Sequence, residues 1–304
     1  MTWKLAQIQS VSLWQQISLF IMKYLFTLTL LIFTLTGCSQ LIEKKASDFG
    51  DQLTQSMLNF EDPATVEDAM PTFIILLNSM ASQKNAGPSS KLATAQLLGA
   101  YSSAFVADEK RQKTLANLAF TYAKEGSCQT DKRWCNIEQL KGKDFSTFVN
   151  SLKKEDVPLI YSYAGAWLGY INTHSDDWNA IANLQHCKML LELVITFDET
   201  YDHAGAHLYL GAIASALPEA IGGKPEIAKQ HFERAIELTN GKSLIVKVEY
   251  ARRYARATFN KTLHHKLLTD VIAVDPKVPG LTLMNAWAQQ QAHQLLSEED
   301  DYFF

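Results

Sequence analysis

Apolar residues recur at every third and fourth position over most of this chain. The pattern is clearest in residues 92–124, 159–172, 184–196 and 227–238. This spacing gathers apolar side chains on one face of an α-helix, and alternating patterns typical of β-strands are scarce. Pro158, Pro225 and Pro279 fall where helices would begin or break. The sequence therefore predicts an all-α fold.

A pattern of two consecutive helices repeats four times. The second helix of each unit carries three buried-type positions at helical spacing: Ala116, Phe120 and Ala123; Cys187, Leu191 and Val194; Ala228, Phe232 and Ala235; His264, Leu268 and Val271. The first helix of each unit carries a small residue where the two helices would press together: Gly99, Gly169, Gly211 and Ala251. This is the pattern of the tetratricopeptide repeat. One helix pair cannot bury its apolar face alone. We therefore predict a right-handed stack of tetratricopeptide-like helix pairs, an α-α superhelix with a concave binding face.

The N-terminal part carries the pattern of a bacterial lipoprotein signal. Met22 and Lys23 precede an uncharged apolar run that ends in Leu35-Thr36-Gly37-Cys38. From this order we interpret Cys38 as the lipidation site and the first residue of the mature chain. Lipidation there would anchor the protein stably, because two or more acyl chains hold a protein on a membrane. A transmembrane helix is the alternative, but the run is shorter than the roughly 20 residues that a span needs.

The predicted organisation has four parts. Residues 1–37 are a start assigned too early plus a lipoprotein signal peptide, 38–60 a tether and first helical segment, 61–296 the tetratricopeptide-like domain, and 297–304 an acidic tail. The tail is either disordered or docks its aromatic end in a neighbouring molecule. No aspartate follows Cys38, which favours the periplasmic side of the outer membrane over inner-membrane retention.

Composition and cysteine spacing disfavour nucleic-acid binding and a zinc site, and they favour one disulfide. The chain has 28 basic and 32 acidic residues and no basic run, which disfavours binding to nucleic acid. In an oxidising periplasm Cys128 and Cys135 would close a small loop as a disulfide; two free thiols are the alternative. A zinc site is less favoured, because no second cysteine pair or histidine pair accompanies them. Cys187 fits a buried small apolar position.

No motif of an enzyme is present. His203 and His207 share the spacing of metal ligands, but Ala204 stands where a zinc protease has glutamate. We interpret His207 as a histidine hydrogen-bonded between repeats. The sequence has no Gly-x-Ser-x-Gly, and Gly222-Gly223-Lys224-Pro225 fits a turn between helices better than a phosphate loop. We expect no catalytic residue, no metal and no cofactor, and reject an envelope hydrolase.

Aromatic residues on the first helices of the units are the remaining candidates for binding. In this repeat class those helices line the concave face, so the aromatics would form an amphipathic wall; the alternative is that they fill the core. Arg253, with Arg252 and Arg256, would pair with a carboxylate ligand or simply face solvent. The candidate binding residues are Tyr163, Trp167, Tyr170, His207, Tyr209, Tyr250, Arg253 and Tyr254.

Three motifs carry a resemblance to a known family. They are Gly205-Ala206-His207-Leu208-Tyr209-Leu210-Gly211, Leu217-Pro218-Glu219-Ala220-Ile221-Gly222-Gly223-Lys224-Pro225 and His231-Phe232-Glu233-Arg234-Ala235. Later matches are Lys247-Val248-Glu249-Tyr250-Ala251, Asp275-Pro276 and Pro279-Gly280-Leu281-Thr282-Leu283-Met284-Asn285. With the cysteine signal and the helical repeats, these resemble the T component associated with TRAP transporters, the TatT family.

The resemblance implies a periplasmic lipoprotein without catalytic residues. It also implies assembly into a homotrimer, docking of a TRAP-type solute-binding protein, and a ligand that is hydrophobic or an organic acid. The expected function is that of an accessory component in solute uptake. The alternative is a general tetratricopeptide scaffold lipoprotein that organises envelope proteins and binds no small molecule.

Overall fold

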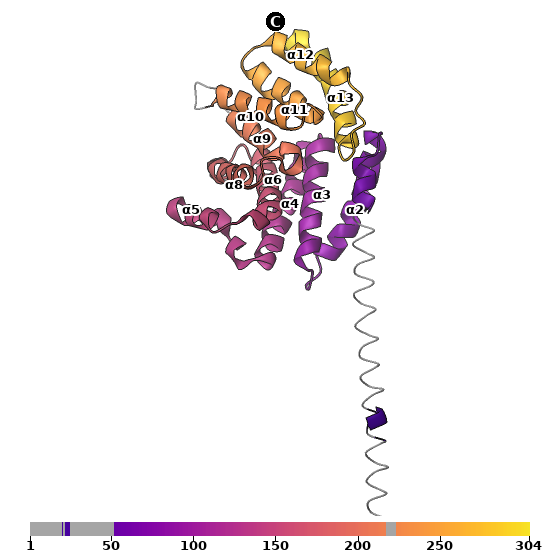
Figure 1. Cartoon of the computed structure of the whole chain (residues 1–304), viewed down its shortest axis with the longest axis vertical. Helices are drawn as coiled ribbons and strands as arrows, with labels where there is room; N and C mark the ends of the chain where they lie inside the picture. The colour runs from indigo at the N-terminus through magenta and orange to yellow at the C-terminus, as the bar shows by residue number, and fades with distance from the viewer. Residues whose placement is uncertain (1–19, 21, 25–51, 217–222) are drawn as a thin grey trace, which may run out of the picture. The chain divides into compact units, whose positions relative to one another are not determined.

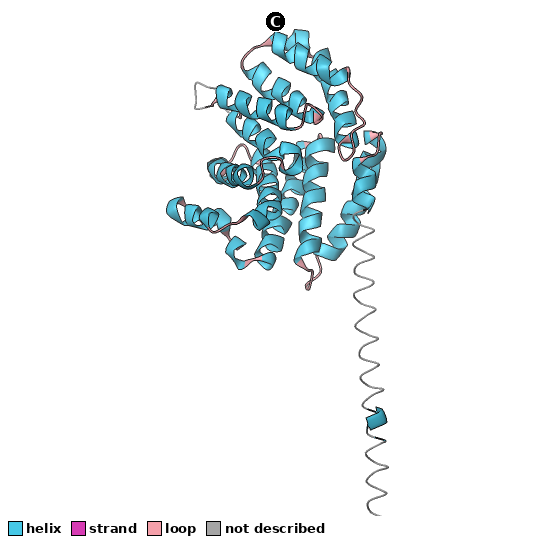
Figure 2. Cartoon of the chain, viewed as in Figure 1, coloured by secondary structure: helices cyan, strands magenta, loops and turns pink. Residues whose placement is uncertain are grey.

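The computed structural model describes residue 20 and residues 22–24, 52–216 and 223–304. Cys38 and, apart from residues 20 and 22–24, the expected signal segment 1–37 lie outside the described residues. The chain divides into two compact units, Met1–Met57 and Leu58–Phe304. The fold and the site both belong to the second unit, in which every regular element among the described residues is helical (Figure 2). The prediction of an all-α fold is confirmed.

The order of helices along the chain follows the sequence pattern. The α-helices are α2 (Pro63–Ala81), α3 (Pro88–Phe105), α4 (Glu109–Thr130), α5 (Gly142–Asn150), α6 (Val157–Thr173), α7 (Trp178–Ala182), α8 (Leu184–Phe197), α9 (Tyr201–Ala214), α10 (Pro225–Leu238), α11 (Leu244–Glu249), α12 (Lys261–Ile272), α13 (Thr282–Ser297) and α14 (Glu299–Tyr302) (Figure 1). Short 3₁₀ turns are η1 (Lys132–Trp134), η2 (Ile137–Gln139) and η3 (Lys154–Asp156), and η5 (Tyr250–Ala255) is a π-helix that continues α11.

Local chemistry explains where several helices begin. Pro158 lies in the first turn of α6 and Pro225 opens α10, positions at which the missing N–H of proline costs no hydrogen bond. Asp177 precedes α7, and its carboxylate accepts a hydrogen bond from the N–H of Asn179 at 2.8 Å. Pro279 lies in the connection before α13.

Helices that follow one another in the chain pack against one another. The predicted pairs correspond to α3 with α4, α6 with α8, α9 with α10, and α11–η5 with α12, and each pair is in contact. All twelve positions of the second helices in the repeat pattern are buried. The periodicity therefore identifies the buried faces correctly. The right-handed superhelical stacking of the pairs stays a prediction.

The prediction of close helix approach at the small residues is correct at Gly211 and wrong at Gly99 and Gly169. A Cβ on Gly211 would meet the Phe232 ring at 2.9 Å, whereas a Cβ on Gly99 or Gly169 would have no contact within 4 Å. In the first unit the tight contact between α3 and α4 lies elsewhere, at Gly126, where an added Cβ would lie 2.9 Å from the Leu92 side chain. The helix crossing point has shifted along the helices, which frees Gly99 from the contact.

The buried side chains form three clusters. One joins α4, α5, α6 and α8 and contains both Trp134 and Trp167. A second joins α10, α11, η5, α12 and α13 around Phe232. The third lies between α2, α3 and α4, and it includes Leu283 from α13. The last long helix thus contributes to the core of the first helices.

The C-terminal helices return to the N-terminal end of the unit. Helix α13 packs against α2, and the indole Nε1 of Trp287 donates to the carbonyl oxygen of Ala104 at 3.1 Å. The N–H of Gly280 donates to Asn59 Oδ1 at 2.8 Å. These contacts join the two ends of the helical series, an arrangement that no repeat pattern predicts.

The segment 297–304 belongs to the helical unit. Phe303 is buried against the ring of His264, with ring centroids 5.0 Å apart. The buried carboxylate of Glu299 contacts Nδ1 of His264 at 2.7 Å and Nδ1 of His265 at 2.9 Å. The aromatic end therefore docks on its own chain.

Candidate functional site

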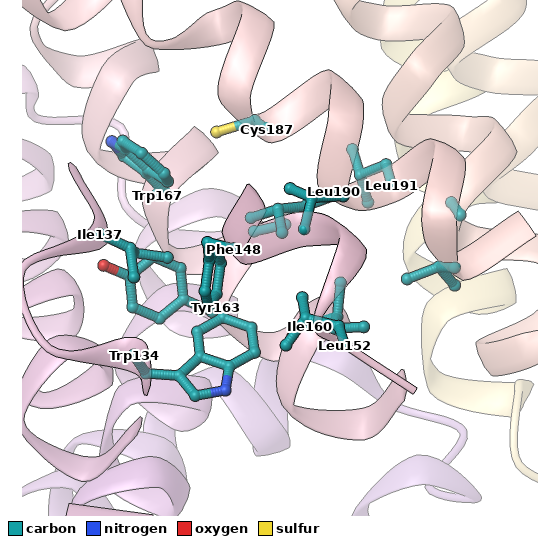
Figure 3. Packing of buried hydrophobic residues seen from close by; sticks show 14 of the residues in the cluster. Trp134, Ile137, Phe148, Leu152, Ile160, Tyr163, Trp167, Cys187, Leu190 and Leu191 are labelled. Carbon is teal, nitrogen blue, oxygen red and sulfur yellow. The ribbon is translucent and has the colours of Figure 1, made fainter. Parts of the chain in front are cut away.

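The aromatic residues of α6 lie mainly in the protein core. Tyr163 and Trp167 are 0% and 1% exposed, and Phe120 of α4 packs its ring against both. Figure 3 shows these two side chains among Trp134 and the apolar residues of the first cluster. Because they have almost no exposed surface, Tyr163 and Trp167 stabilise the packing of α4, α6 and α8 and offer no surface to a ligand.

Tyr170 lies at the end of the same aromatic group and is half-buried. Its ring lies 5.1 Å from that of Phe120 and stacks on the His174 ring at 4.1 Å. The His174 Nδ1 in turn bonds to the carbonyl oxygen of Tyr170 at 2.9 Å. Tyr170 therefore keeps exposed surface while its position is fixed from both sides.

Tyr209 belongs to a second aromatic group, formed by α6 and α9. Its ring lies 5.6 Å from that of Tyr161, which in turn lies 5.3 Å from Tyr201. Burial, and after it the neighbouring Tyr209 and Asp202, raises the pKa of the Tyr161 hydroxyl well above its usual value. A Cβ on Gly205 would lie 2.0 Å from the Tyr161 hydroxyl oxygen, so only glycine leaves room for this group. The sequence pattern singled out Tyr209, but it did not predict the packing of Tyr161 against Tyr201 and Gly205.

His207 lies in a polar cluster that connects α9 with α10. The Glu199 carboxylate accepts from His207 Nε2 at 3.1 Å, and His207 Nδ1 lies 2.9 Å from Nδ1 of His231. Since the carboxylate takes the Nε2 proton, Nδ1 of His207 accepts and His231 donates. Arg234 holds Glu199 with two bonds, from Nε at 2.9 Å and Nη2 at 2.8 Å. The sequence predicted a hydrogen-bonded His207 between repeats; its bond to His231 instead joins the two helices of one unit.

The charges of this cluster are fixed by its neighbours. Hydrogen bonds from Arg234 lower the pKa of the Glu199 carboxyl to about 2. Burial lowers the pKa of His207, and burial with the nearby His207 lowers the pKa of His231 to about 4. At neutral pH the cluster therefore consists of one carboxylate, one guanidinium and two neutral imidazoles. Each side chain of the cluster is hydrogen-bonded to another member, and these bonds connect α9 with α10.

Tyr250 and Tyr254 lie on the π-helix η5 and face α10. Both are buried, and their hydroxyls contact Glu233 at 3.2 Å and Glu226 at 3.4 Å. The burial and the Glu233 carboxylate raise the pKa of Tyr250. These tyrosines fill the second core cluster and are not part of an exposed wall.

The arginines of η5 are paired with acidic residues of the chain. Arg253 Nε donates to Glu249 Oε2 at 2.6 Å and remains 37% exposed. Arg252 also contacts Glu249, and Arg256 Nη2 donates to Glu298 at 3.0 Å. The structure therefore does not bring the eight candidates together. Tyr170 on α6, Tyr209 on α9 and Arg253 on η5 retain exposed surface, whereas the other five are buried.

Two further predicted features concern cysteine and metal chemistry. Cys128 and Cys135 form a disulfide with Cα atoms 4.5 Å apart, and Cys187 is a buried free thiol. Within the part of the chain that the structure describes, no group of three or more potential ligands is arranged to hold a metal ion. Lipidation of Cys38 lies outside the described residues.

The comparison with protein families supplies the assignment. The family model described as TRAP transporter T-component matches residues 59–303. The chain belongs to this family. The match covers all the helices from α2 to α14, including the C-terminal segment around Phe303, so this T component carries the family pattern across its whole helical unit. No curated protein matches the chain.

Membership in the family gives this T component an accessory role in a TRAP-type transport system. Among its described helices, none combines the length and the apolar character that crossing a bilayer requires. The site residues that sequence reasoning missed are Glu199 and Arg234. His231 and Arg234 stand three apart on α10, which predicts a shared helix face, but nothing in the sequence links them to Glu199, 35 residues away from Arg234.

Proposed function

We propose that this T component is a lipoprotein anchored through Cys38 on the periplasmic side of the outer membrane. There it binds a TRAP-type solute-binding protein and a small hydrophobic or organic-acid ligand, and it works without chemistry. The observation that carries the proposal is the family match over residues 59–303. The cysteine signal at Cys38 supports the anchor, and the Cys128–Cys135 disulfide suits an oxidising compartment.

The finer parts of the proposal rest on the resemblance and the geometry together. Assembly as a homotrimer comes from the family pattern alone. Of the candidate binding residues, Tyr170, Tyr209 and Arg253 are the ones that we propose for contact with a ligand or partner, because a buried side chain has no surface to offer. We also propose that the helix pairs form a right-handed tetratricopeptide-like stack and that the partner docks on the surface of this stack.

A pull-down from periplasmic extract tests the proposal. The purified mature protein is the bait, and mass spectrometry identifies the bound proteins and small molecules. A matched bait carries Trp178→Ala, which removes an 84% exposed tryptophan that no part of the proposal uses. Recovery of a TRAP-type solute-binding protein with both baits supports the accessory role. Recovery of unrelated envelope proteins without any solute would instead assign the general scaffold function.

A further inference from the structure

Three connecting segments of the chain meet around a pocket of about 440 Å³. They are the connection from α8 into α9, the turn between α10 and α11, and the connection from α12 to α13. This volume lies within the range of small-molecule sites, roughly 300–1,000 Å³. None of the eight residues predicted from the sequence to bind a ligand lines the pocket.

Unusual backbone conformations gather at this pocket. The described chain has nine residues with positive φ, and six of them line it or directly adjoin its lining. They are Asp202, His203 and Ala204 (φ 47°, 55° and 59°), Asn240 (51°), Gly241 (69°) and Gly280 (79°). Three consecutive left-handed residues other than glycine persist only where the surroundings hold them, and such strain gathers at ligand sites.

Buried hydrogen bonds hold these segments in place. The Asn285 side chain, 1% exposed, accepts from the N–H of Leu244 at 3.0 Å and donates to the carbonyl oxygens of Lys242 at 2.9 Å and Pro276 at 3.2 Å. One amide thus joins the second and third segments. In the first segment, the N–H of Ala204 donates to the carbonyl oxygen of Thr200 at 3.2 Å. The walls of the pocket are therefore preformed.

The lining combines an apolar part with positive charge. Leu238, Val278 and Leu281 supply the apolar surface, and no aspartate or glutamate lines the pocket. Lys242 does line it, and no acidic side chain of the described residues lies within ion-pair distance of its ammonium group. His203 adds a second nitrogen donor from the opposite segment.

The nearby acidic groups lie outside the lining. The Asp198 carboxylate accepts from the hydroxyl of Thr200 at 2.9 Å, and neither Asp198 nor Asp202 lines the pocket. Because no carboxylate lines the pocket or pairs with Lys242, an anion entering it would meet a cation together with an apolar wall.

We infer that this pocket binds a small organic anion with an apolar body. The anionic group would pair with Lys242 and accept a hydrogen bond from His203, while the body would lie against Leu238, Val278 and Leu281. A role for this binding in solute uptake rests on the proposed function, whereas the binding itself is a property of the isolated chain. The proposed function and the binding of an anion can therefore be refuted separately. Failure to capture a partner protein would not refute anion binding, and failure to bind an anion would not refute capture of the partner.

Ligand-detected NMR titration of the purified protein tests the inference. The probes are hexanoate and 1-hexanesulfonate, with hexanamide as the uncharged match of the first. Lys242→Met keeps the alkyl chain and removes the charge, and His203→Asn removes the imidazole with a residue that tolerates a left-handed backbone. Lys143→Met on α5 is the matched control, because Lys143 is exposed and remote from the lining.

We expect hexanoate and hexanesulfonate to bind, and hexanamide to bind about tenfold more weakly or not at all. We expect Lys242→Met to weaken hexanoate binding by about the same factor, His203→Asn to weaken it less, and Lys143→Met to leave it unchanged. Equal binding of hexanamide, equal effects of Lys242→Met and Lys143→Met, or no binding of any probe would each overturn the inference.

Discussion

Trp287 of α13 donates its indole N–H to the backbone carbonyl oxygen of Ala104, the penultimate residue of α3, at 3.1 Å and across 183 residues of sequence. This bond joins the last long helix to the first helices of the unit. Leu283, one turn earlier on α13, is buried in the core between α2, α3 and α4. The first and last long helices of the unit therefore contact one another, and the stability of the unit depends on contacts between distant parts of the chain.

Removing the Trp287 hydrogen bond should destabilise the unit. Trp287→Phe keeps a ring and loses the donor, which leaves the Ala104 carbonyl without this partner and costs about 1 kcal/mol. In a chain of this size that loss lowers Tm by about 2–4 °C. Chemical denaturation and calorimetry provide the measurement. Trp178→Phe, at an 84% exposed tryptophan, is the control. Equal effects of the two substitutions would contradict a stabilising contact between α13 and α3.

Alanine substitutions at three glycines should separate crowded from open helix positions. Gly211→Ala places a methyl group 2.9 Å from the Phe232 ring and should cost about 1–3 kcal/mol. Gly99→Ala and Gly169→Ala meet nothing within 4 Å and should be neutral or stabilise by up to about 1 kcal/mol, since alanine favours helix more than glycine. Unfolding free energies of the three variants decide the matter, and uniform destabilisation would contradict the described packing.

The disulfide should stabilise the loop that contains Trp134. Replacing both Cys128 and Cys135 by alanine should lower the free energy of unfolding by about 2–3 kcal/mol, from the entropy of closing a loop of this length. Thiol titration of the unreduced, denatured protein should detect Cys187, together with Cys38 in unlipidated protein, and neither member of the pair. Two additional reactive thiols, or an unchanged stability of the double variant, would show that the bond is absent or without effect.

Stability should fall as the pH drops from about 6.5 towards 4, partly through His231. Its folded-state pKa is lowered to about 4, so the unfolded chain binds the proton first and protonation favours unfolding. The contribution is complete above the unfolded pKa of 6.5 and is lost as the pH falls through this window. Denaturation between pH 7.5 and 4 should show a smaller loss for His231→Gln than for wild type. His293→Gln, at an exposed histidine of α13, should behave as wild type.

The Glu199 carboxylate should contribute at neutral pH and cease to contribute in acid. Its pKa is lowered from 4.5 to about 2, so its stabilising effect is present above 4.5 and is lost as the pH falls towards 2. Glu199→Gln should therefore be less stable than wild type at pH 7, with the difference shrinking below pH 4.5. A difference that stays constant down to pH 2 would show that the pairing with Arg234 does not act through charge.

The sequence predicted the parts of the fold that depend on local periodicity. The positions around Phe120, Leu191, Phe232 and Leu268 are all buried as expected, because helical spacing determines which face of a helix is apolar. The crossing points of the helices were not predictable in this way. Gly99 carries the repeat pattern, yet the close contact lies at Gly126, because a crossing point depends on turn lengths and on side chains of the partner helix.

The candidate site was harder to predict than the fold. Burial of Tyr163 and Tyr250 depends on which helices cover them, and a list of aromatic positions contains no such information. The pocket lined by His203 and Lys242 depends on three connections far apart in sequence and on backbone angles that residue type does not reveal. The ion pair between Glu199 and Arg234 also joins residues that are far apart in sequence, so it could not be predicted from local patterns.

The accessory role is tested most directly by the affinity between two purified proteins. One is this T component, and the other is the TRAP-type solute-binding protein of the same organism, studied by isothermal titration calorimetry. The account predicts saturable binding with a defined stoichiometry, unchanged in the Trp178→Ala variant. Absence of heat and of co-elution at high concentration, with both proteins folded, would contradict the central claim.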